Sequence, residues 1–381
     1  MQYRDDRVSG NKLSILGLGC MRFPRSAEET ERIIVSAIDG GVNYFDTAYL
    51  YPGSEETLGK ILAGHKKRDS VFIATKLPLI MCRGPEDFDR FFNRELERLQ
   101  TGHIDYYLMH MITGVSQWDR FRAWGIEAWI AEKKRAGQIR QAGFSFHGSR
   151  GEFLNILNLY PWDFCQIQYN YSDENFQAGK TGLRAAAAKG LPVIIMEPLL
   201  GGRLATGLPR EAVNVFARAD PSLSPAAWGL RWLWNHSEVT CVLSGMSSAA
   251  QMGENLQTAA NFSPLAESDL GVIAEVVGIF NRAYRIHCTG CNYCMPCPRG
   301  VNIPGCFAAY NTSFVQNFVL GMQQYVTSTA AAGKNPQGPR LCVECGVCEQ
   351  HCPQHLPIRQ YLKHVAGRME SPPIRLVLSL A

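Results

Sequence analysis

Four polar side chains fall at or just beyond the ends of predicted strands, where strand alternation alone would place apolar residues. They are Asp46, Tyr51, Lys76 and His110. A phenol, with an ordinary pKa of about 10, is too weak an acid to act alone at neutral pH. A neighbouring ammonium group lowers that pKa, and a carboxylate keeps the ammonium charged and oriented. Side chains of these types, if the fold brings them close together, would suit general acid–base chemistry.

Cysteines form the second concentration of reactive side chains. Nine of the thirteen follow residue 281, in the runs CTGCNYCMPCP (288–298) and CVECGVCEQHCP (342–353) and at Cys306. In a reducing compartment such runs hold a metal or a cluster more often than they form disulfides. Zinc usually takes two Cys-x2-Cys pairs that lie farther apart, so these runs favour iron–sulfur clusters. The remaining cysteines are predicted to be small core residues: Cys20, Cys82, Cys165 and Cys241.

The sequence predicts a fold that could position these polar residues. Between about residues 13 and 245, short runs of apolar, β-branched residues alternate with helical patterns. Eight such alternations predict a parallel (β/α)8 TIM barrel; a doubly wound sheet would usually have five or six strands. The first strand-to-helix turn also lacks the third glycine of a dinucleotide fingerprint. In a TIM barrel the catalytic residues lie at the carboxyl ends of the strands. The predicted strands are 13–19, 42–48, 71–76, 104–110, 141–147, 164–170, 192–198 and 239–245.

The chain has 381 residues, which suits one barrel and a smaller module. We expect a barrel domain at 1–262, a helical linker at 263–286, a mainly helical ferredoxin-like domain at 287–370 and a tail at 371–381. Charged residues at 19% and hydrophobic residues at 46% exclude a disordered chain. The polar first residues and the absence of long apolar runs predict a soluble, cytoplasmic protein with no membrane partner. A net charge of +4 is too small to indicate a nucleic-acid partner.

The barrel region resembles the aldo-keto reductase family over roughly residues 12–260. The resemblance is carried by DTAYLY at 46–51, GSEETLG at 53–59, ATK at 74–76 and LMH at 108–110. It implies that Tyr51 is the proton donor, that Lys76 and Asp46 tune its acidity, and that His110 orients the substrate oxygen. The implied substrate is a small molecule with a carbonyl or alcohol group. The whole chain is similar to predicted aldo/keto reductases that carry a C-terminal ferredoxin domain.

The same resemblance implies where a nicotinamide cofactor, NAD(H) or NADP(H), would bind. Phe146 stands where the family has an asparagine, and Met196 stands where an aromatic ring commonly stacks on the nicotinamide. Gly245 and Gln251 replace the lysine and arginine that hold the 2′-phosphate of NADPH, which favours NADH or poor discrimination between the two nucleotides. Backbone amides of the glycine-containing loops would receive the pyrophosphate. The implied contacts are Ser145, Gln166, Met196, Gly201, Gly202, Gly245, Ser247, Gln251 and Asn255.

The second cysteine run has the Cys-x2-Cys-x2-Cys-x3-Cys-Pro spacing of bacterial ferredoxins, whereas the first has two residues before its last cysteine. The analogy implies two 4Fe-4S clusters, each with a fourth ligand from the other run; a single cluster stays an alternative. Cys306 is the alternative to Cys297. The implied ligands are Cys288, Cys291, Cys294 and Cys352 for one cluster, and Cys342, Cys345, Cys348 and Cys297 for the other.

Three functional hypotheses follow. In the first, an iron–sulfur oxidoreductase carries out carbonyl or alcohol chemistry in the barrel, and its clusters relay electrons to or from a redox partner protein. A nicotinamide transfers two electrons at once and a cluster one, so a flavin would suit as converter, but no flavin motif is present. The second is an NAD(P)H-dependent carbonyl reductase with structural or oxygen-sensing clusters. The third is a non-enzymatic redox sensor on a barrel that has lost its catalytic activity. The intact set of four polar residues argues against this hypothesis, and the altered nicotinamide contacts argue for it.

Overall fold

The computed structural model describes residues 1–331, 335–372 and 374. The chain forms two compact units. The barrel unit comprises Met1–Leu199 and Ala226–Ala266, and the cysteine unit comprises Leu200–Pro225 and Glu267–Ala381. The boundaries predicted at residues 262 and 286 stay a prediction. Most of the predicted tail, 371–381, lies outside the described residues.

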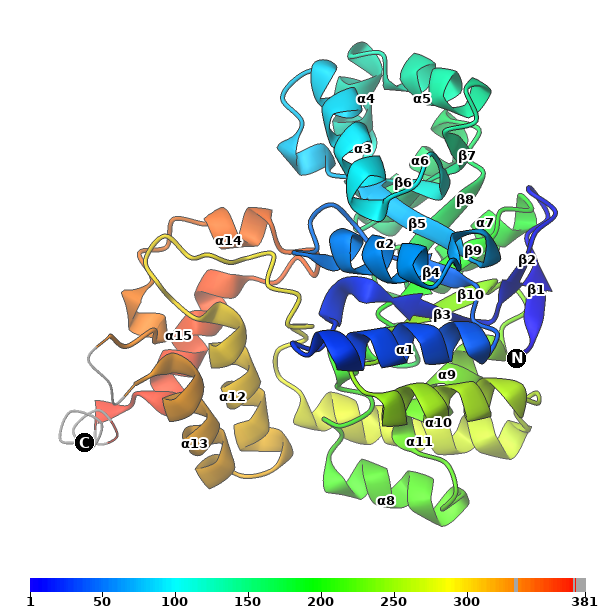
Figure 1. Cartoon of the computed structure of the whole chain (residues 1–381). Coiled ribbons are helices and arrows are strands. Elements are labelled where there is room, and N and C mark those ends of the chain that lie inside the picture. Colours follow the sequence, from blue (N-terminus) through cyan, green and yellow to red (C-terminus); the bar gives the residue numbers. More distant parts are fainter. Residues whose placement is uncertain (332–334, 373, 375–381) are drawn as a thin grey trace. The chain divides into compact units, whose positions relative to one another are not determined.

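Eight parallel strands close into a barrel in the order β10-β3-β4-β5-β6-β7-β8-β9 (Figure 1). This confirms the predicted (β/α)8 fold. Each predicted strand contains one of the observed strands or overlaps with it, because strands buried on both faces show as continuous apolar runs in a sequence. The strands are β3 (Leu16–Gly19), β4 (Tyr44–Asp46), β5 (Phe72–Leu77), β6 (Ile104–Ile112), β7 (Ile139–Phe146), β8 (Phe164–Gln168), β9 (Val193–Met196) and β10 (Cys241–Ser244).

The barrel interior is filled by side chains that alternate along the strands. One buried cluster takes a residue from most of the strands, including Tyr44, Ala74, Leu108, Phe164 and Ile194. Residues two positions further along a strand point to the same face, so they form the next layer toward the carboxyl ends. That next layer consists of Asp46, Lys76, His110, Gln166 and Met196. Most strand residues predicted for the site therefore belong to one layer.

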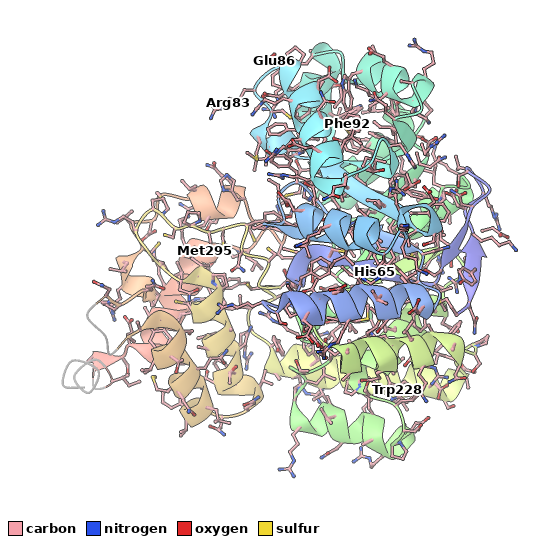
Figure 2. All side chains as sticks on the ribbon, viewed as in Figure 1. His65, Arg83, Glu86, Phe92, Trp228 and Met295 are labelled. Atoms are coloured by element: carbon pink, nitrogen blue, oxygen red, sulfur yellow. The ribbon has the colours of Figure 1, made fainter. Side chains whose placement is uncertain are left out.

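Helices cover the outside of the barrel (Figure 1). Ser26, Ser149 and Ser248 each precede a helix, and each side chain accepts a hydrogen bond from a backbone N–H in the first turn. Phe92, labelled in Figure 2, lies on α3. Its ring packs edge-on against that of Tyr107 on β6, with ring centroids 5.2 Å apart. The helices of this unit are α1 (Ala27–Asp39), α2 (Ser54–Gly64), α3 (Glu86–Leu99), α4 (Val115–Ala123), α5 (Ile126–Arg135), α6 (Arg150–Leu159), α7 (Gly179–Ala188), α9 (Pro225–Trp234) and α10 (Ala249–Ala260).

A short antiparallel hairpin precedes the barrel, formed by β1 (Tyr3–Asp5) and β2 (Lys12–Ser14). The predicted strand at 13–19 therefore divides, since β2 ends at Ser14 and the barrel strand β3 begins at Leu16. Asp6, beside the hairpin, accepts a hydrogen bond of 2.7 Å from the hydroxyl of Tyr106 inside the barrel. This contact ties the hairpin to the barrel interior.

The cysteine unit is mainly helical, as expected. Its core gathers apolar residues of α12 and α15 around the cysteine runs, and Met295 of the first run packs against it (Figure 2). Among the helices in the described part of the chain, none is long and apolar enough to cross a membrane. The helical elements are η4 (Leu200–Gly202), α8 (Arg210–Ala219), α11 (Glu267–Ala283), α12 (Ile303–Val315), α13 (Phe318–Thr329), η5 (Pro339–Leu341), α14 (Val347–Gln350) and α15 (Ile358–Met369).

Candidate active site and candidate cluster sites

A buried ion pair lies at the carboxyl ends of β4 and β5. The ammonium group of Lys76 donates to both carboxylate oxygens of Asp46 at 2.7 Å and to the backbone carbonyl of Thr47 at 2.6 Å. Lys76 is 0% and Asp46 3% exposed. An ammonium group has three N–H donors, so these three acceptors satisfy it completely. Such a pair is held rigidly, because breaking it would leave an uncompensated charge in the interior.

Tyr51 and His110 complete the group of four polar residues. The Tyr51 ring centroid lies 5.1 Å from the Lys76 ammonium nitrogen and 6.1 Å from the His110 ring centroid, with the two rings nearly perpendicular. Tyr51 is half-buried in the loop between β4 and α2, and His110 is buried on β6. The structure therefore brings together Asp46, Tyr51, Lys76 and His110 as the sequence predicts.

Burial and charge set the protonation states of two of these groups. Burial lowers the pKa of His110 well below its ordinary value, and the positive charge of Lys76 lowers it further. His110 is therefore a neutral imidazole at physiological pH. Burial raises the pKa of Asp46, while the charge and hydrogen bonds of Lys76 oppose that rise. The site thus combines one ion pair with one neutral imidazole.

A local irregularity in β6 helps to place His110. The pairing of β6 with β7 shifts register between Met109 and Ile112, and Met111 has a left-handed backbone with φ of 60°. The backbone N–H of Met111 donates to the hydroxyl oxygen of Ser145 at 2.8 Å. A bulge of this kind re-aims the side chains beside it. Ser145, a predicted cofactor contact, thus also supports the strand that carries His110.

Gln166, in the middle of β8, and Met196, at the end of β9, are brought together. The amide nitrogen of Gln166 donates to the sulfur of Met196 at 3.7 Å. The amide oxygen of Gln166 is buried and has no hydrogen-bond partner among the described residues. By contrast, Phe146 is buried outside this group, against Phe144 and Phe153. The open acceptor on Gln166 is the strongest sign of a polar ligand in this part of the site, because buried polar atoms are normally satisfied.

At the start of α10, backbone N–H groups already donate hydrogen bonds to side chains of this protein. The amide oxygen of Gln251 accepts from the backbone N–H of Ser247 at 2.8 Å, and Glu29 of α1 accepts from the N–H of Ala249 at 2.8 Å. Asn255 lies deeper, where its amide donates to the hydroxyl of Ser244 at 3.1 Å. Gly245 directly follows β10. Sequence reasoning missed Glu29, since no local signal links it to a helix 220 residues away.

The predicted phosphate loop after β9 belongs to the cysteine unit. Gly201 and Gly202 have left-handed backbones, with φ of 66° and 91°. A β-carbon on Gly201 would lie 2.2 Å from the backbone carbonyl oxygen of Thr289, so only glycine fits there. The structure therefore places Gly201 against the residue that follows the predicted cluster ligand Cys288.

Four thiols from both cysteine runs line one pocket. They belong to Cys288, Cys291, Cys294 and Cys352, the set that the ferredoxin analogy assigns to one cluster. Burial raises the pKa of Cys294 to about 12, and the neighbouring thiols of the other three add to the rise. In the described residues, no three His, Cys, Asp or Glu side chains are grouped so that they could hold a metal ion. Four cysteine thiolates are the ligand set of a 4Fe-4S cluster.

The two cysteine runs share a backbone conformation. Two residues after the first cysteine of each run, Gly290 and Glu344 have φ of 69° and 56°. Four residues after it, Asn292 and Gly346 have φ of 67° and 78°. Alternating left-handed residues turn successive N–H groups toward one point and form the anion-binding nests found at iron–sulfur sites. The second run therefore has the same loop as the run that lines the cavity.

The remaining predicted ligands are distributed around the second loop. Cys345 is exposed, while Cys342, Cys348 and Cys297 are half-buried against the core of the unit. Burial raises the pKa of Cys348 to about 11, with smaller contributions from Glu349 and Cys342. Cys306, the alternative ligand, is fully buried on α12 and does not line the described cavity. The assignment of Cys297 as the fourth ligand stays a prediction.

Comparison with known proteins identifies the family of each region. The model of the aldo/keto reductase family matches residues 15–277, and the model of the 4Fe-4S dicluster domain matches residues 287–356. The first match covers the whole barrel and the second covers both cysteine runs. Together they agree with the two regions expected from the sequence.

Individual relatives cover most of the chain. The uncharacterized oxidoreductase YqkF of Bacillus subtilis is 28% identical over 71% of this chain and 94% of its own length. The D-galacturonate reductase of Fragaria ananassa is 34% identical over 64% of this chain and 81% of its own length. Among solved structures, the aldo-keto reductase AKR11C1 from Bacillus halodurans, in its holo form, matches 72% of this chain and 96% of its own with 26% identity and a TM-score of 0.60.

Proposed function

Because the chain belongs to the aldo/keto reductase family and carries a 4Fe-4S domain, we propose a two-part redox function. The barrel reduces a carbonyl group of a small molecule, or oxidises the corresponding alcohol, with Tyr51 as the proton donor. The cysteine unit exchanges electrons with a redox partner protein. The observation that carries the barrel proposal is the buried Lys76–Asp46 pair beside the ring of Tyr51.

The four residues have distinct roles in this reaction. The charge of Lys76 favours the phenolate form of Tyr51, which makes the phenol a stronger acid. All three Lys76 protons are already donated, so Lys76 acts on Tyr51 through its charge. Neutral His110 orients the substrate oxygen by a hydrogen bond. Tyr51 then gives its proton to that oxygen, and in alcohol oxidation it takes the proton back.

The residues near this site fit a nicotinamide, which when bound would supply the hydride to the carbonyl carbon. The open amide oxygen of Gln166 suits the NH2 of the carboxamide group. The hydroxyl of Ser145 accepts from Met111 and keeps its own proton for the carboxamide oxygen. Met196, in contact with Gln166, offers a thioether to the ring.

The loop after β10 favours NADH over NADPH in this proposal. A helix N-terminus attracts phosphate through its free N–H groups and its dipole. At α10, Gln251 and Glu29 already accept from two N–H groups of this region, and Glu29 adds a carboxylate. Arg32, on the same helix, is paired with both Glu28 and Glu29. A 2′-phosphate at the start of α10 would therefore meet the negative charge of Glu29.

Two observations support two clusters in the cysteine unit. The cavity lined by Cys288, Cys291, Cys294 and Cys352 suits the first cluster. The repeated left-handed positions of the second run suit another cluster on Cys342, Cys345, Cys348 and Cys297. Since Cys345 is exposed, this second loop offers a redox partner access to the cluster.

Replacement of Tyr51 by phenylalanine tests the barrel proposal. We expect Tyr51→Phe to lower NADH-dependent reduction of small aldehydes and ketones at least about a hundredfold, the usual contribution of a general acid. Tyr49→Phe is the matched control, because Tyr49 lies in the same loop but packs against Phe91 and Arg98. The control should stay within about threefold of the wild-type protein, and both variants should keep their iron.

The same experiment separates the alternatives. Equal activity in Tyr51→Phe and Tyr49→Phe would show that Tyr51 is not the proton donor. A wild-type protein that holds its clusters and reduces no carbonyl with NADH or NADPH would favour a redox sensor on a retired barrel. A wild-type protein that reduces carbonyls with NADH, but whose clusters never take electrons from NADH or from a donor protein, would favour structural or oxygen-sensing clusters.

A further inference from the structure

The loop after β9 is an unusual element, since it leaves a barrel strand and yet folds with the cysteine unit. Residues 200–208 contain the short helical turn η4, and they are followed by α8. Leu200 and Leu204 are fully buried. Helix α8 packs on α11, the helix that leads to the first cysteine run. The loop therefore takes its support from the region that carries the predicted cluster ligands.

Direct contacts join this loop to residues 284–289. The hydroxyl of Tyr284 donates to the backbone carbonyl of Gly207 at 3.1 Å. The guanidinium of Arg203 donates to the carbonyl of Ile286 at 3.4 Å and lies 5.5 Å from the Tyr284 ring centroid. Gly201 approaches the carbonyl oxygen of Thr289 so closely that no β-carbon fits between them. Thr289 also lines the cysteine cavity, next to Cys288.

The loop is also strained. Leu200, Gly201 and Gly202 follow one another with left-handed φ values of 49°, 66° and 91°. A leucine in this conformation is unfavourable and persists only where surrounding structure holds it. The surrounding structure here is the buried packing of Leu200 and the backbone of Thr289. Release of the 286–290 segment would therefore let the loop relax.

We propose that the cluster on Cys288, Cys291, Cys294 and Cys352 holds the β9 loop in its strained conformation through Thr289. Filling the cavity fixes the loop, and loss of the cluster releases it. The inference rests on the proposed cluster, and goes beyond it by assigning Thr289 and Gly201 as positioning residues between the cluster and a loop that starts from a barrel strand. Because such coupling is reciprocal, a distorted loop must also weaken retention of the cluster.

Hydrogen exchange tests whether loss of the cluster releases the β9 loop. Full-length protein is purified anaerobically, its iron and sulfide are counted, and one portion is freed of iron with a chelator under reducing conditions. We expect amides in residues 200–208 to exchange at least about tenfold faster in the iron-free protein. Helix α10 (Ala249–Ala260) should not change, which shows that the barrel is intact. Equal exchange of residues 200–208 in both states would overturn the proposal.

The rate of iron release tests whether a distorted β9 loop weakens retention of the cluster. Gly201→Ala puts a β-carbon against Thr289, whereas Gly202→Ala carries a left-handed strain with no heavy atom within 4 Å of its β-carbon. We expect the iron of Gly201→Ala to pass to a chelator at least about fivefold faster than that of Gly202→Ala. Equal release rates would overturn the proposal. A protein that never holds iron and sulfide would instead contradict the proposed cluster, and a lack of NADH-dependent activity would contradict only the barrel proposal.

Discussion

Lys76 shows how one residue organises the barrel site by charge. Its three protons are bound by Asp46 and Thr47, so its contribution to Tyr51 and His110 is electrostatic. The same charge keeps His110 neutral by lowering its pKa further than burial alone does. The same cation makes the imidazole less basic, and in the proposed reaction its role is to make the phenol of Tyr51 more acidic. This division of roles follows from the alternation that places Lys76, Asp46 and His110 in one layer.

Glu95 predicts a pH dependence of stability. Burial, and then the charge of Glu55, raise the pKa of Glu95 well above its ordinary value; its carboxyl accepts from the Tyr107 hydroxyl at 2.7 Å. In the unfolded chain it ionises near its ordinary pKa of about 4.3. Above that pH, Glu95 is ionised in the unfolded chain but still protonated in the folded protein, which favours the unfolded state. The contribution of Glu95 to the free energy of unfolding therefore falls as the pH rises toward the folded-state pKa, by up to about 1.4 kcal/mol per pH unit.

Glu95→Gln removes this effect. We expect the free energy of unfolding of the variant, relative to wild type, to increase between pH 4.5 and pH 6.5 by about 1–3 kcal/mol. Urea titrations at several pH values, followed by tryptophan fluorescence, measure the difference. A difference that is constant across this range would show that Glu95 ionises normally in the folded protein.

The position of Glu29 at the start of α10 predicts that this residue affects the preference for NADH over NADPH. Its carboxylate accepts from Ala249 at the start of α10, so removing its charge should favour a phosphate there. We expect Glu29→Gln to lower the ratio of the NADPH Kd to the NADH Kd about fivefold or more, as measured by equilibrium binding. Glu31→Gln is the control, because Glu31 lies on the same helix but pairs with His65. An unchanged ratio in Glu29→Gln would remove Glu29 from nucleotide selection.

At the scale of elements, the close approach of α2 and α3 positions the loop that carries Tyr51. A β-carbon on Gly59 of α2 would lie 2.5 Å from the backbone carbonyl oxygen of Arg98, at the end of α3. Backbone atoms cannot move aside as a flexible side chain does. Gly59 therefore sets the distance between the two helices.

Two glycine substitutions in the same helix test this packing. Gly59→Ala should destabilise the barrel by about 1–3 kcal/mol, the usual effect of overpacking. Gly64→Ala, with open space around its β-carbon, should be neutral or stabilise by up to about 1 kcal/mol, since alanine favours the helix. Thermal unfolding measures both changes. Equal effects of the two substitutions would contradict the assigned role of Gly59.

The elements that sequence reasoning found are those with a local signal. Buried parallel strands appear as apolar runs, and the polar residues that end them mark the site. The hairpin of β1 and β2 has only three residues per strand, and its register depends on contacts such as Asp6 with Tyr106. The contacts of Glu29 with α10 and of Gly201 with Thr289 join distant parts of the chain. No pattern within either segment indicates such a contact, so the sequence alone does not predict it.

At the scale of the whole molecule, the chain joins an aldo/keto reductase barrel, a family that uses nicotinamide as a hydride donor, to a 4Fe-4S domain, whose clusters carry one electron each. Residues 282–381 contain nine lysines and arginines against three acidic residues. Each oxidised 4Fe-4S cluster with four thiolates carries a charge of about −2, so two clusters would offset most of this excess. The basic character of the region therefore follows from its proposed cofactors and needs no nucleic acid.

The most direct test of the account is whether NADH reduces the clusters. Anaerobic protein with both clusters oxidised is mixed with one equivalent of NADH, and the visible absorbance of the clusters is followed. Oxidation of NADH to NAD+ and a proton releases two electrons as a pair, so with a bound flavin as the converter we predict bleaching that corresponds to one electron in each cluster. NADH that binds without bleaching, in a protein that also holds no flavin, would contradict the account and show that barrel and clusters work separately.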